Sequence, residues 1–142
     1  ERINLIKNFL NHADVLKLAK EEATLFFEHA NPSLISQQMS KKTDVIITNG
    51  KNPVEWYING LQGITEISHS QKIVDTTGAG DAFLSGLISK LITSGYPSNK
   101  LEIENYIKFA SVCGLLTCLG EGAIEQQPDY EKVNKFLGSR IS

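Results

Sequence analysis

The stretch that most constrains this chain lies at residues 75–83, where an extended run passes into a helix. After this point apolar residues recur at helical spacing, at Ala79, Phe83, Leu87 and Leu91. Gly78 and Gly80 therefore stand at a helix start, where backbone N–H groups are unpaired and the helix dipole is positive. Because glycine has no side chain to keep an anion away, this arrangement predicts a cradle for a phosphate or another oxyanion.

Asp81 follows in the first turn of the predicted helix, at the mouth of that cradle. A carboxylate repels a neighbouring phosphate, so we interpret Asp81 as a base that takes the proton of an attacking hydroxyl. A dinucleotide-binding loop needs a third glycine where Phe83 stands, and the sequence has no G-x-x-x-x-G-K-[ST] run. A plain helix start, with Thr and Asp as caps, is the remaining alternative.

Composition excludes several function classes. The chain has 142 residues, about the size of one domain, and 41% of them are hydrophobic. The net charge is −2 and no long basic run occurs, so nucleic acid is not an expected partner. No apolar run reaches the length of a membrane span. Cys113 and Cys118 are expected to be reduced thiols that pack in the interior.

Hydrophobic periodicity predicts alternating helices and strands. Helices are expected over residues 2–11, 20–29, 33–40, 78–94, 99–119 and 129–138. Strands are expected over 14–18 and 44–48, and Asn59-Gly60 predicts a hairpin that joins 54–58 to 61–67. Asn52-Pro53 reads as a turn. This order favours an α/β fold with a largely parallel sheet.

The string D-T-T-G-A-G-D-A-F at residues 75–83 resembles the C-terminal signature of the PfkB, or ribokinase-like, family of carbohydrate and nucleoside kinases. The resemblance implies a ribokinase-like three-layer sandwich with a mainly parallel sheet, and ATP-dependent phosphorylation of a hydroxyl. It also implies that Asp81 is the catalytic base, and that the backbone of Gly78, Ala79 and Gly80 forms the anion hole.

Residues 13–23 resemble the family's A-D-x-x-K-x-N-x-x-E stretch. In this resemblance Glu22 matches the acidic residue that helps to organise Mg²⁺ through water. Ala19 replaces the family's Asn, and an alanine side chain cannot hydrogen-bond a phosphate or a metal-bound water. A solvated carboxylate in a first helical turn is the alternative interpretation of Glu22.

Thr48-Asn49-Gly50 resembles the family's T-x-G at the end of a central strand, which implies nucleotide contacts from Thr48 and Gly50. Ligands of open α/β sheets bind at the carboxyl ends of strands, and the strand predicted over residues 44–48 ends here in a loop. Pro53 stands where the family usually has a further glycine. Since proline lacks an N–H and fixes φ, we expect the loop after Gly50 to differ.

Residues 109–123 resemble the family's helix of small residues and its closing G-A. This resemblance implies nucleotide contacts from Ser111 and Gly122, with small side chains that leave room for adenine. Close packing of the helix on the sheet is the alternative reason for small residues. Asp75, Thr77 and Cys118 match the surroundings of a monovalent-cation site, for K⁺, that many family members have.

The resemblance also implies that residues 1–142 form the C-terminal part of one kinase domain, without the N-terminal sugar-binding half. Such a chain is expected to be inactive alone and, when complete, to be a cytoplasmic homodimer that binds a small-molecule sugar. The fructokinase branch is the preferred match, with ribose, ketodeoxygluconate and nucleosides left open as substrates. A non-catalytic nucleotide-binding regulatory module, suggested by Ala19 and Pro53, and a structural remnant are the rival hypotheses.

Overall fold

The computed structural model of the protein describes residues 2–67, 75–120 and 128–139. The chain divides into two compact units, Glu1–Glu66 and Ile67–Ser142. The first unit holds every described strand, and the second unit is helical over its described residues. Gly122 lies outside the described residues, as does most of the extended run that precedes the glycine-rich stretch.

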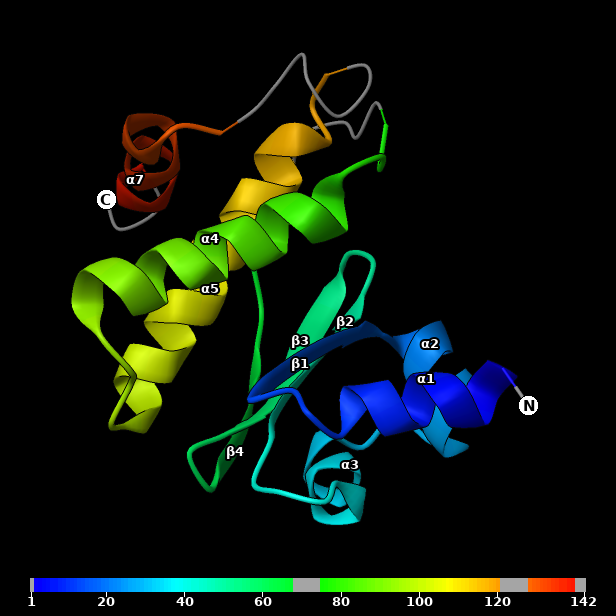
Figure 1. The fold of residues 1–142 in the computed structure, drawn as a ribbon. Helices are drawn as coiled ribbons and strands as arrows, with labels where there is room; N and C mark the ends of the chain where they lie inside the picture. The colour runs from blue at the N-terminus through cyan, green and yellow to red at the C-terminus, as the bar shows by residue number, and fades with distance from the viewer. Residues whose placement is uncertain (1, 68–74, 121–127, 140–142) are drawn as a thin grey trace. The chain divides into compact units, whose positions relative to one another are not determined.

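The first unit is a four-stranded sheet with three helices (Figure 1). In chain order its elements are α1 (Arg2–Leu10), β1 (Val15–Ala19), α2 (Lys20–Phe27), α3 (Pro32–Gln38), β2 (Asp44–Asn49), β3 (Asn52–Ile58) and β4 (Leu61–Thr65). The strand order follows the sequence, β1-β2-β3-β4. The helices and strands predicted for this unit are therefore confirmed, with ends that differ by a few residues.

The described sheet is mixed rather than mainly parallel. β1 and β2 run parallel, whereas β2 with β3 and β3 with β4 pair antiparallel. The second antiparallel pair is the predicted hairpin, whose turn residues Asn59 and Gly60 have φ values of 51° and 78°. Both values are left-handed, and a turn of this kind matches the twist of the strands that it joins. The α/β class is confirmed, and the hairpins account for the antiparallel pairings.

The predicted turn at Asn52-Pro53 is wrong, because these two residues begin β3. The chain turns earlier: Asn49 and Asn52 are already partners in the sheet, and Gly50 has a φ of 55°. Glycine adopts this left-handed backbone without strain, so Gly50 permits the tight connection. The run of residues 44–48 is the predicted buried strand, but it ends in this tight turn rather than in a loop.

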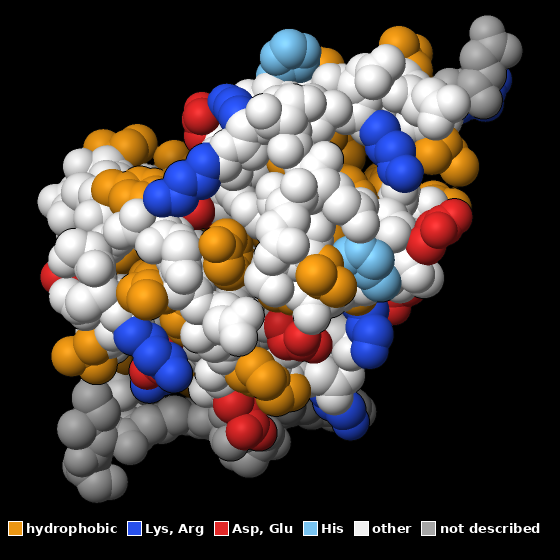
Figure 2. All heavy atoms as spheres, turned by 90° about the horizontal axis from the view of Figure 1, so that it is seen from below, with side chains coloured by type: hydrophobic (Ala, Val, Ile, Leu, Met, Phe, Trp, Pro, Cys, Tyr) orange, Lys and Arg blue, Asp and Glu red, His pale blue; other side chains and the backbone are white. Residues whose placement is uncertain are grey.

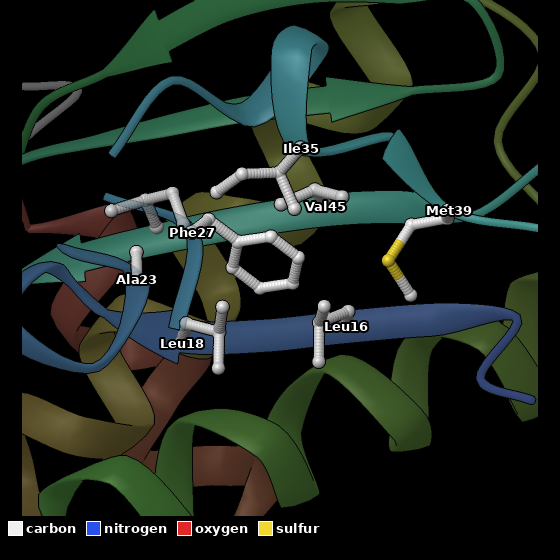
Figure 3. Close-up of a cluster of buried hydrophobic side chains, with 8 residues drawn as sticks. Leu16, Leu18, Ala23, Phe27, Ile35, Met39 and Val45 are labelled. Carbon is white, nitrogen blue, oxygen red and sulfur yellow. The ribbon is translucent and has the colours of Figure 1, made fainter. Parts of the chain in front are cut away.

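A buried cluster joins the parallel strands to α2 and α3 (Figure 3). Leu16 and Leu18 of β1 and Val45 of β2 point toward the helices, and the ring of Phe27 lies over them. Ala23, Ile35, Met39 and Ile47 complete the cluster. Alternate residues of β1 are buried, as expected of a strand with one face against helices.

The tryptophan of β3 anchors the hairpin. Trp56 is fully buried, and its Nε1–H donates to Thr65 Oγ1 of β4 at 2.9 Å. Gly63 is the partner of Trp56 in the ladder, and a Cβ there would overlap the indole ring. A glycine is therefore required opposite the tryptophan, and the ring covers the space that a side chain would otherwise fill.

The apolar side of α1 is only partly covered. The helix is confirmed at Arg2–Leu10, but Leu5 is 72% exposed and Phe9 is 79% exposed. Leu10 packs against the cluster of Figure 3, and the Nζ of Lys7 lies 5.6 Å from the centroid of the Phe27 ring. The first helix is thus attached to the unit through its C-terminal turn.

The second unit consists of α4 (Ala79–Ser94), α5 (Lys100–Thr117) and α7 (Tyr130–Gly138), all three predicted from the sequence. α4 packs against α5, and α5 packs against α7 (Figure 1). Phe109, Val112 and Cys113 of α5 form a buried cluster with Val133 of α7. The helices of this unit thus share one core in which α5 is the central member.

Charges of both signs are interspersed over the face seen in Figure 2, with hydrophobic groups scattered between them. This surface fits the small net charge of −2 and the absence of a long basic run in the sequence. Of the helices that the structure describes, none has the length and apolar character to span a membrane.

Candidate active site

The glycine-rich stretch forms the start of α4, as predicted. Gly78 is the residue before the helix, with a φ of 80°, and it offers no side-chain cap. This left-handed backbone suits glycine and is strained for other residues. Gly78, Ala79, Gly80 and Asp81 are therefore brought together in one helical turn.

The amides of this first turn are not equivalent. Ala79 N–H donates to the Thr76 carbonyl at 3.2 Å, and Ala82 N–H donates to the Gly78 carbonyl at 2.9 Å. Within the described part of the chain, no backbone acceptor is recorded for the amides of Gly80 and Asp81. The second and third amides of a helix have no intrahelical partner, so these two are available to an anion.

Asp81 projects beside a cavity of about 320 Å³ between α4, α5 and α7. Gly78 and Asp81 line one end of it, and Phe109, Tyr130 and Val133 supply an apolar wall. Asp81 is exposed, and no hydrogen bond or ion pair is recorded for its carboxylate among the described residues. A carboxylate in this state is free to accept a hydrogen bond from an incoming hydroxyl.

Asp75, Thr77 and Cys118, the residues matched to a monovalent-cation site, lie together. The backbone N–H and the hydroxyl of Thr77 donate to Asp75 Oδ1, at 2.9 Å and 2.7 Å. Asp75 N–H donates to the Cys118 carbonyl at 3.3 Å. The end of α5 is thus tied to the segment that leads into the glycine-rich turn.

Both cysteines are free and buried, which confirms the prediction of packing thiols. Burial raises the pKa of the Cys113 thiol to about 11. Burial, and then the nearby charge of Asp75, raise the pKa of the Cys118 thiol. A thiol with a raised pKa is a poor nucleophile, so neither side chain is suited to covalent chemistry.

In the first unit, the other predicted site residues gather at the carboxyl ends of the two parallel strands. Ala19 at the end of β1 is the ladder partner of Thr48 near the end of β2. The Thr48 hydroxyl donates to the Leu18 carbonyl at 3.4 Å, and Gly50 follows in the tight turn. The start of α2 and the Thr48–Gly50 turn therefore share one edge of the sheet, where ligands of α/β proteins bind.

Glu22 has a local structural contact. Its Oε2 accepts the Ala19 N–H at 2.8 Å, so the carboxylate covers the backbone at the start of α2. This hydrogen bond is one of the two that make a capping box. The other, from the Glu22 N–H to the side chain of residue 19, cannot form because Ala19 has no side-chain acceptor. Among the described residues no group of three or more His, Cys, Asp or Glu side chains could hold a metal ion.

Ser111 and Gly114, two of the small residues of α5, lie in different environments. The Ser111 hydroxyl is buried, and no hydrogen-bond partner is recorded for it in the described structure. It does not belong to the cavity beside Asp81. A Cβ on Gly114 would lie 2.9 Å from the Ala79 carbonyl oxygen, so this glycine permits contact between α5 and α4. Packing of helix on helix, rather than of helix on sheet, thus explains Gly114.

Sequence reasoning did not find the cluster that borders the cavity on α4, α5 and α7. Lys90 Nζ lies 4.6 Å from the Phe109 ring centroid and 5.4 Å from that of Tyr130. The two rings are themselves 5.5 Å apart, and Lys90 Nζ is 3.5 Å from the Tyr130 hydroxyl. These residues are far apart in the chain and form no motif, so no local sequence signal could have indicated their contact.

Comparison with known proteins places this chain in a family. The model of the "pfkB family carbohydrate kinase" family matches residues 3–129. The probable fructokinase-7 of Arabidopsis thaliana is 29% identical over 96% of this chain, and a fructokinase of Klebsiella pneumoniae is 31% identical over 88%. The chain spans 41% of the length of each of these two relatives.

Solved structures agree in fold. A fructokinase of Vibrio cholerae O395, crystallised with fructose, ADP and calcium ion, superposes on 95% of this chain with a TM-score of 0.81 and 27% identity. A fructokinase of Xylella fastidiosa with bound ATP superposes on all of it with a TM-score of 0.87 and 22% identity. These matches cover 44% and 48% of the respective structures. The chain therefore belongs to the pfkB family of carbohydrate kinases.

Proposed function

We propose that this chain forms the nucleotide-binding, C-terminal part of a sugar kinase that transfers the γ-phosphoryl group of ATP to a sugar hydroxyl. Asp81 is the base of this reaction, and the start of α4 is its anion hole. The observation that carries the proposal is the first turn of α4, where, within the described residues, a carboxylate without a recorded partner stands beside two amides without a backbone acceptor.

The chemistry follows from this juxtaposition. The sugar oxygen attacks the γ-phosphorus in line, the bond to the leaving ADP oxygen breaks, and the hydroxyl proton passes to the Asp81 carboxylate. The Gly80 and Asp81 amides, with the positive end of the α4 dipole, stabilise the charge on the transferring group. Most of the rate comes from positioning and charge neutralisation, because an alcohol is far less acidic than a carboxylic acid.

Mg²⁺ would neutralise charge on the nucleotide phosphates, as is usual in phosphoryl transfer. Mg²⁺ characteristically keeps several waters and uses one or two carboxylates together with substrate phosphates. A single acidic residue such as Glu22 fits that mode, whereas a cage of side chains is not needed. Its Oε2 is engaged by Ala19, so Glu22 would act through water, as the family resemblance implies.

The nucleotide contacts that we propose in the first unit are those of Thr48 and Gly50, at the carboxyl end of β2. Ser111 and Gly122 are proposed as nucleotide contacts of the second unit, and the buried Ser111 hydroxyl, which has no hydrogen-bond partner among the described residues, supports its part in this assignment. K⁺ is proposed beside Asp75, Thr77 and the Cys118 carbonyl, since hydrogen bonds hold Asp75 next to both Thr77 and Cys118.

Fructose is the acceptor that we propose first, because the relatives quoted above are named fructokinases. Ribose and nucleosides are the alternatives: an Arabidopsis ribokinase complexed with ribose and ATP, and a Burkholderia nucleoside kinase complexed with inosine, share the fold, with TM-scores of 0.74 and 0.77. In a protein that spans the full length of these relatives, the residues that bind the sugar would decide among fructose, ribose and nucleosides.

An ADP-release assay on the complete protein tests the proposal. The assay uses ATP and Mg²⁺, with and without K⁺, against fructose, ribose, ketodeoxygluconate and adenosine. We expect turnover with one acceptor, highest for fructose and raised by K⁺. ATP binding without turnover on any acceptor would instead support the regulatory module that Ala19 and Pro53 suggest, and reversion of these two residues would be the next step.

A further inference from the structure

The two long helices of the second unit approach each other closely at two glycines. A Cβ on Gly86 of α4 would lie 2.7 Å from the Cys113 sulfur and 3.2 Å from the Ala110 Cα. A Cβ on Gly114 of α5 would lie 2.9 Å from the carbonyl oxygen of Ala79. Each helix therefore depends on a glycine to accommodate the other, but the two contacts differ in what they touch.

The Gly114 contact is made to backbone at the start of α4. Ala79 is the first residue of that helix, and its carbonyl oxygen cannot turn aside as a side chain does. A side chain at position 114 would therefore displace the whole first turn, including Gly80 and Asp81. Glycine is unfavourable in a helix interior compared with alanine, so its presence within α5 is explained by this contact.

The same end of α5 also holds the segment that enters the glycine-rich turn. Cys118, one turn after Gly114, accepts the Asp75 N–H on its carbonyl at 3.3 Å. The Cys118 N–H in turn donates to the Gly114 carbonyl at 3.3 Å. The last turn of α5 therefore contacts the chain on both sides of Gly78, at Asp75 before it and at Ala79 after it.

We propose that Gly114 is a positioning residue for the anion hole: it sets where the Gly80 and Asp81 amides and the Asp81 carboxylate stand. The expected effect on kcat rests on the proposed function, but the placement of the Gly80 and Asp81 amides can be tested without turnover. Gly86 offers the matched control, because Gly86→Ala strains the same pair of helices at Cys113 and Ala110 of α5 and not at the first turn of α4.

The first experiment compares amide NMR spectra of the two variants. Gly114→Ala is expected to shift the amide signals of residues 79–81, whereas Gly86→Ala should shift those near Cys113 and leave residues 79–81 in place. Equal shifts of residues 79–81 in both variants would overturn the proposal, since the displacement would then be a general result of strained helix packing.

A titration of the unsubstituted protein with inorganic phosphate covers the case in which Gly114→Ala does not fold. The Gly80, Asp81 and Gly114 amides should respond along one saturation curve, and the Gly86 amide should not respond. If phosphate saturates Gly80 without moving Gly114, the coupling does not exist and the proposal fails.

Kinetics of the complete protein then separate positioning from stability. Gly114→Ala should lower kcat by about tenfold to a hundredfold, because a misplacement of about 1 Å has effects of this size. Its KM for the sugar should stay within about twofold, because Gly114 touches the start of α4 and not the acceptor. An unchanged kcat would overturn the proposal. If the unsubstituted protein shows no turnover at all, the proposed function fails, whereas the NMR comparison still decides the placement of the amides.

Discussion

The start of α4 differs from the starts of α5 and α7 in the same unit. The Asn99 side chain accepts the Glu102 N–H at 3.0 Å, and the Asp129 side chain accepts the Lys132 N–H at 2.8 Å. Each satisfies one of the amides that a helix start leaves unpaired. Gly78 provides no such cap to α4. In the second unit the starts of α5 and α7 are thus closed by side chains, whereas no side chain of the described residues caps the start of α4.

The first-turn carboxylates show the same contrast. Glu102 of α5 accepts the backbone N–H and the hydroxyl of Ser98, at 2.8 Å and 3.1 Å, and the hydrogen bonds from Ser98 lower the pKa of its carboxyl. Asp81 of α4 has no comparable contact recorded among the described residues. A carboxylate in a first helical turn is therefore not by itself a functional signal; Asp81 is distinguished because the described part of the chain offers it no partner.

A large effect is expected at Gly78, the residue before α4. Gly78→Ala places a Cβ on a backbone with a φ of 80°, which costs about 1–2 kcal/mol of stability and distorts the open turn. Turnover of the complete protein should fall by about tenfold or more. Steady-state kinetics with ATP and fructose, corrected for the folded fraction, measure this change.

Gly95, at the other end of α4, is the control for that substitution. Its φ is 81°, and no atom lies within 4 Å of an added Cβ. Its ψ is −175°, a backbone region that residues other than glycine rarely adopt, so Gly95→Ala should cost at least as much free energy of unfolding as Gly78→Ala, without the loss of turnover. Equal turnover in the two variants would show that the open turn has no special role.

A smaller effect, on stability alone, is expected at the closed start of α5. Asn99→Ala removes the cap and should lower the free energy of unfolding by about 1 kcal/mol, with turnover retained. Chemical denaturation followed by circular dichroism measures the change, and Asn99→Ser, which restores an acceptor, should recover most of it. A loss of turnover beyond the loss of folded protein would mean that the closed start also serves the reaction.

The contact of Lys90 with Phe109 and Tyr130 is expected to contribute less. Lys90→Met keeps an unbranched side chain and removes the charge, so we expect a loss of about 0.5–1 kcal/mol in thermal or chemical unfolding. Lys90→Arg, which keeps the cation over the rings, is the control. An unchanged stability in Lys90→Met would show that the rings pack well without the cation.

The smallest effect is predicted at Asp44, in the first unit. Burial raises the pKa of this carboxyl above its usual 3.8; Oδ1 accepts the Asn59 N–H at 2.9 Å, and Oδ2 has no recorded partner in the described structure. The folded protein therefore holds this proton more tightly than the unfolded chain. Its contribution to the free energy of unfolding is greatest below pH 3.8 and falls as the pH rises through the folded-state pKa.

Asp44→Asn tests this dependence, because it keeps the acceptor for Asn59 and cannot ionise. The stability of the variant relative to the original protein should rise between about pH 3 and about pH 7. The fluorescence of Trp56, the single tryptophan of the chain, reports the unfolding of the unit that contains Asp44. A stability difference that does not change with pH would contradict the prediction.

Local sequence signals predicted the elements of this fold well. The spacing of apolar residues indicated each described helix, and Asn59-Gly60 indicated its hairpin, because these features depend on neighbouring residues. The turn predicted at Asn52-Pro53 was wrong, because a proline at the start of a strand cannot be told from a proline in a turn by its neighbours in the sequence.

The site was predictable only where its residues are contiguous. Residues 75–83 indicated the open helix start, but the role of Glu22 as a backbone acceptor depends on the rotamer that it adopts. The approach of Gly114 to Ala79 joins residues 35 positions apart, and the ring contact of Phe109 with Tyr130 joins two helices. Such contacts are set by the packing of whole elements, which the spacing of residues in one helix does not reveal.

The proposed role of Asp81, at the start of α4, is to take the proton of the acceptor hydroxyl. The direct measurement is ATP binding and turnover with fructose for Asp81→Asn in the complete protein, beside Glu102→Gln as the matched change at a closed helix start. We expect Asp81→Asn to bind ATP as before and to lose about 10²–10⁴-fold in kcat, whereas Glu102→Gln should retain its kcat. Turnover retained by Asp81→Asn would show that Asp81 is not the base.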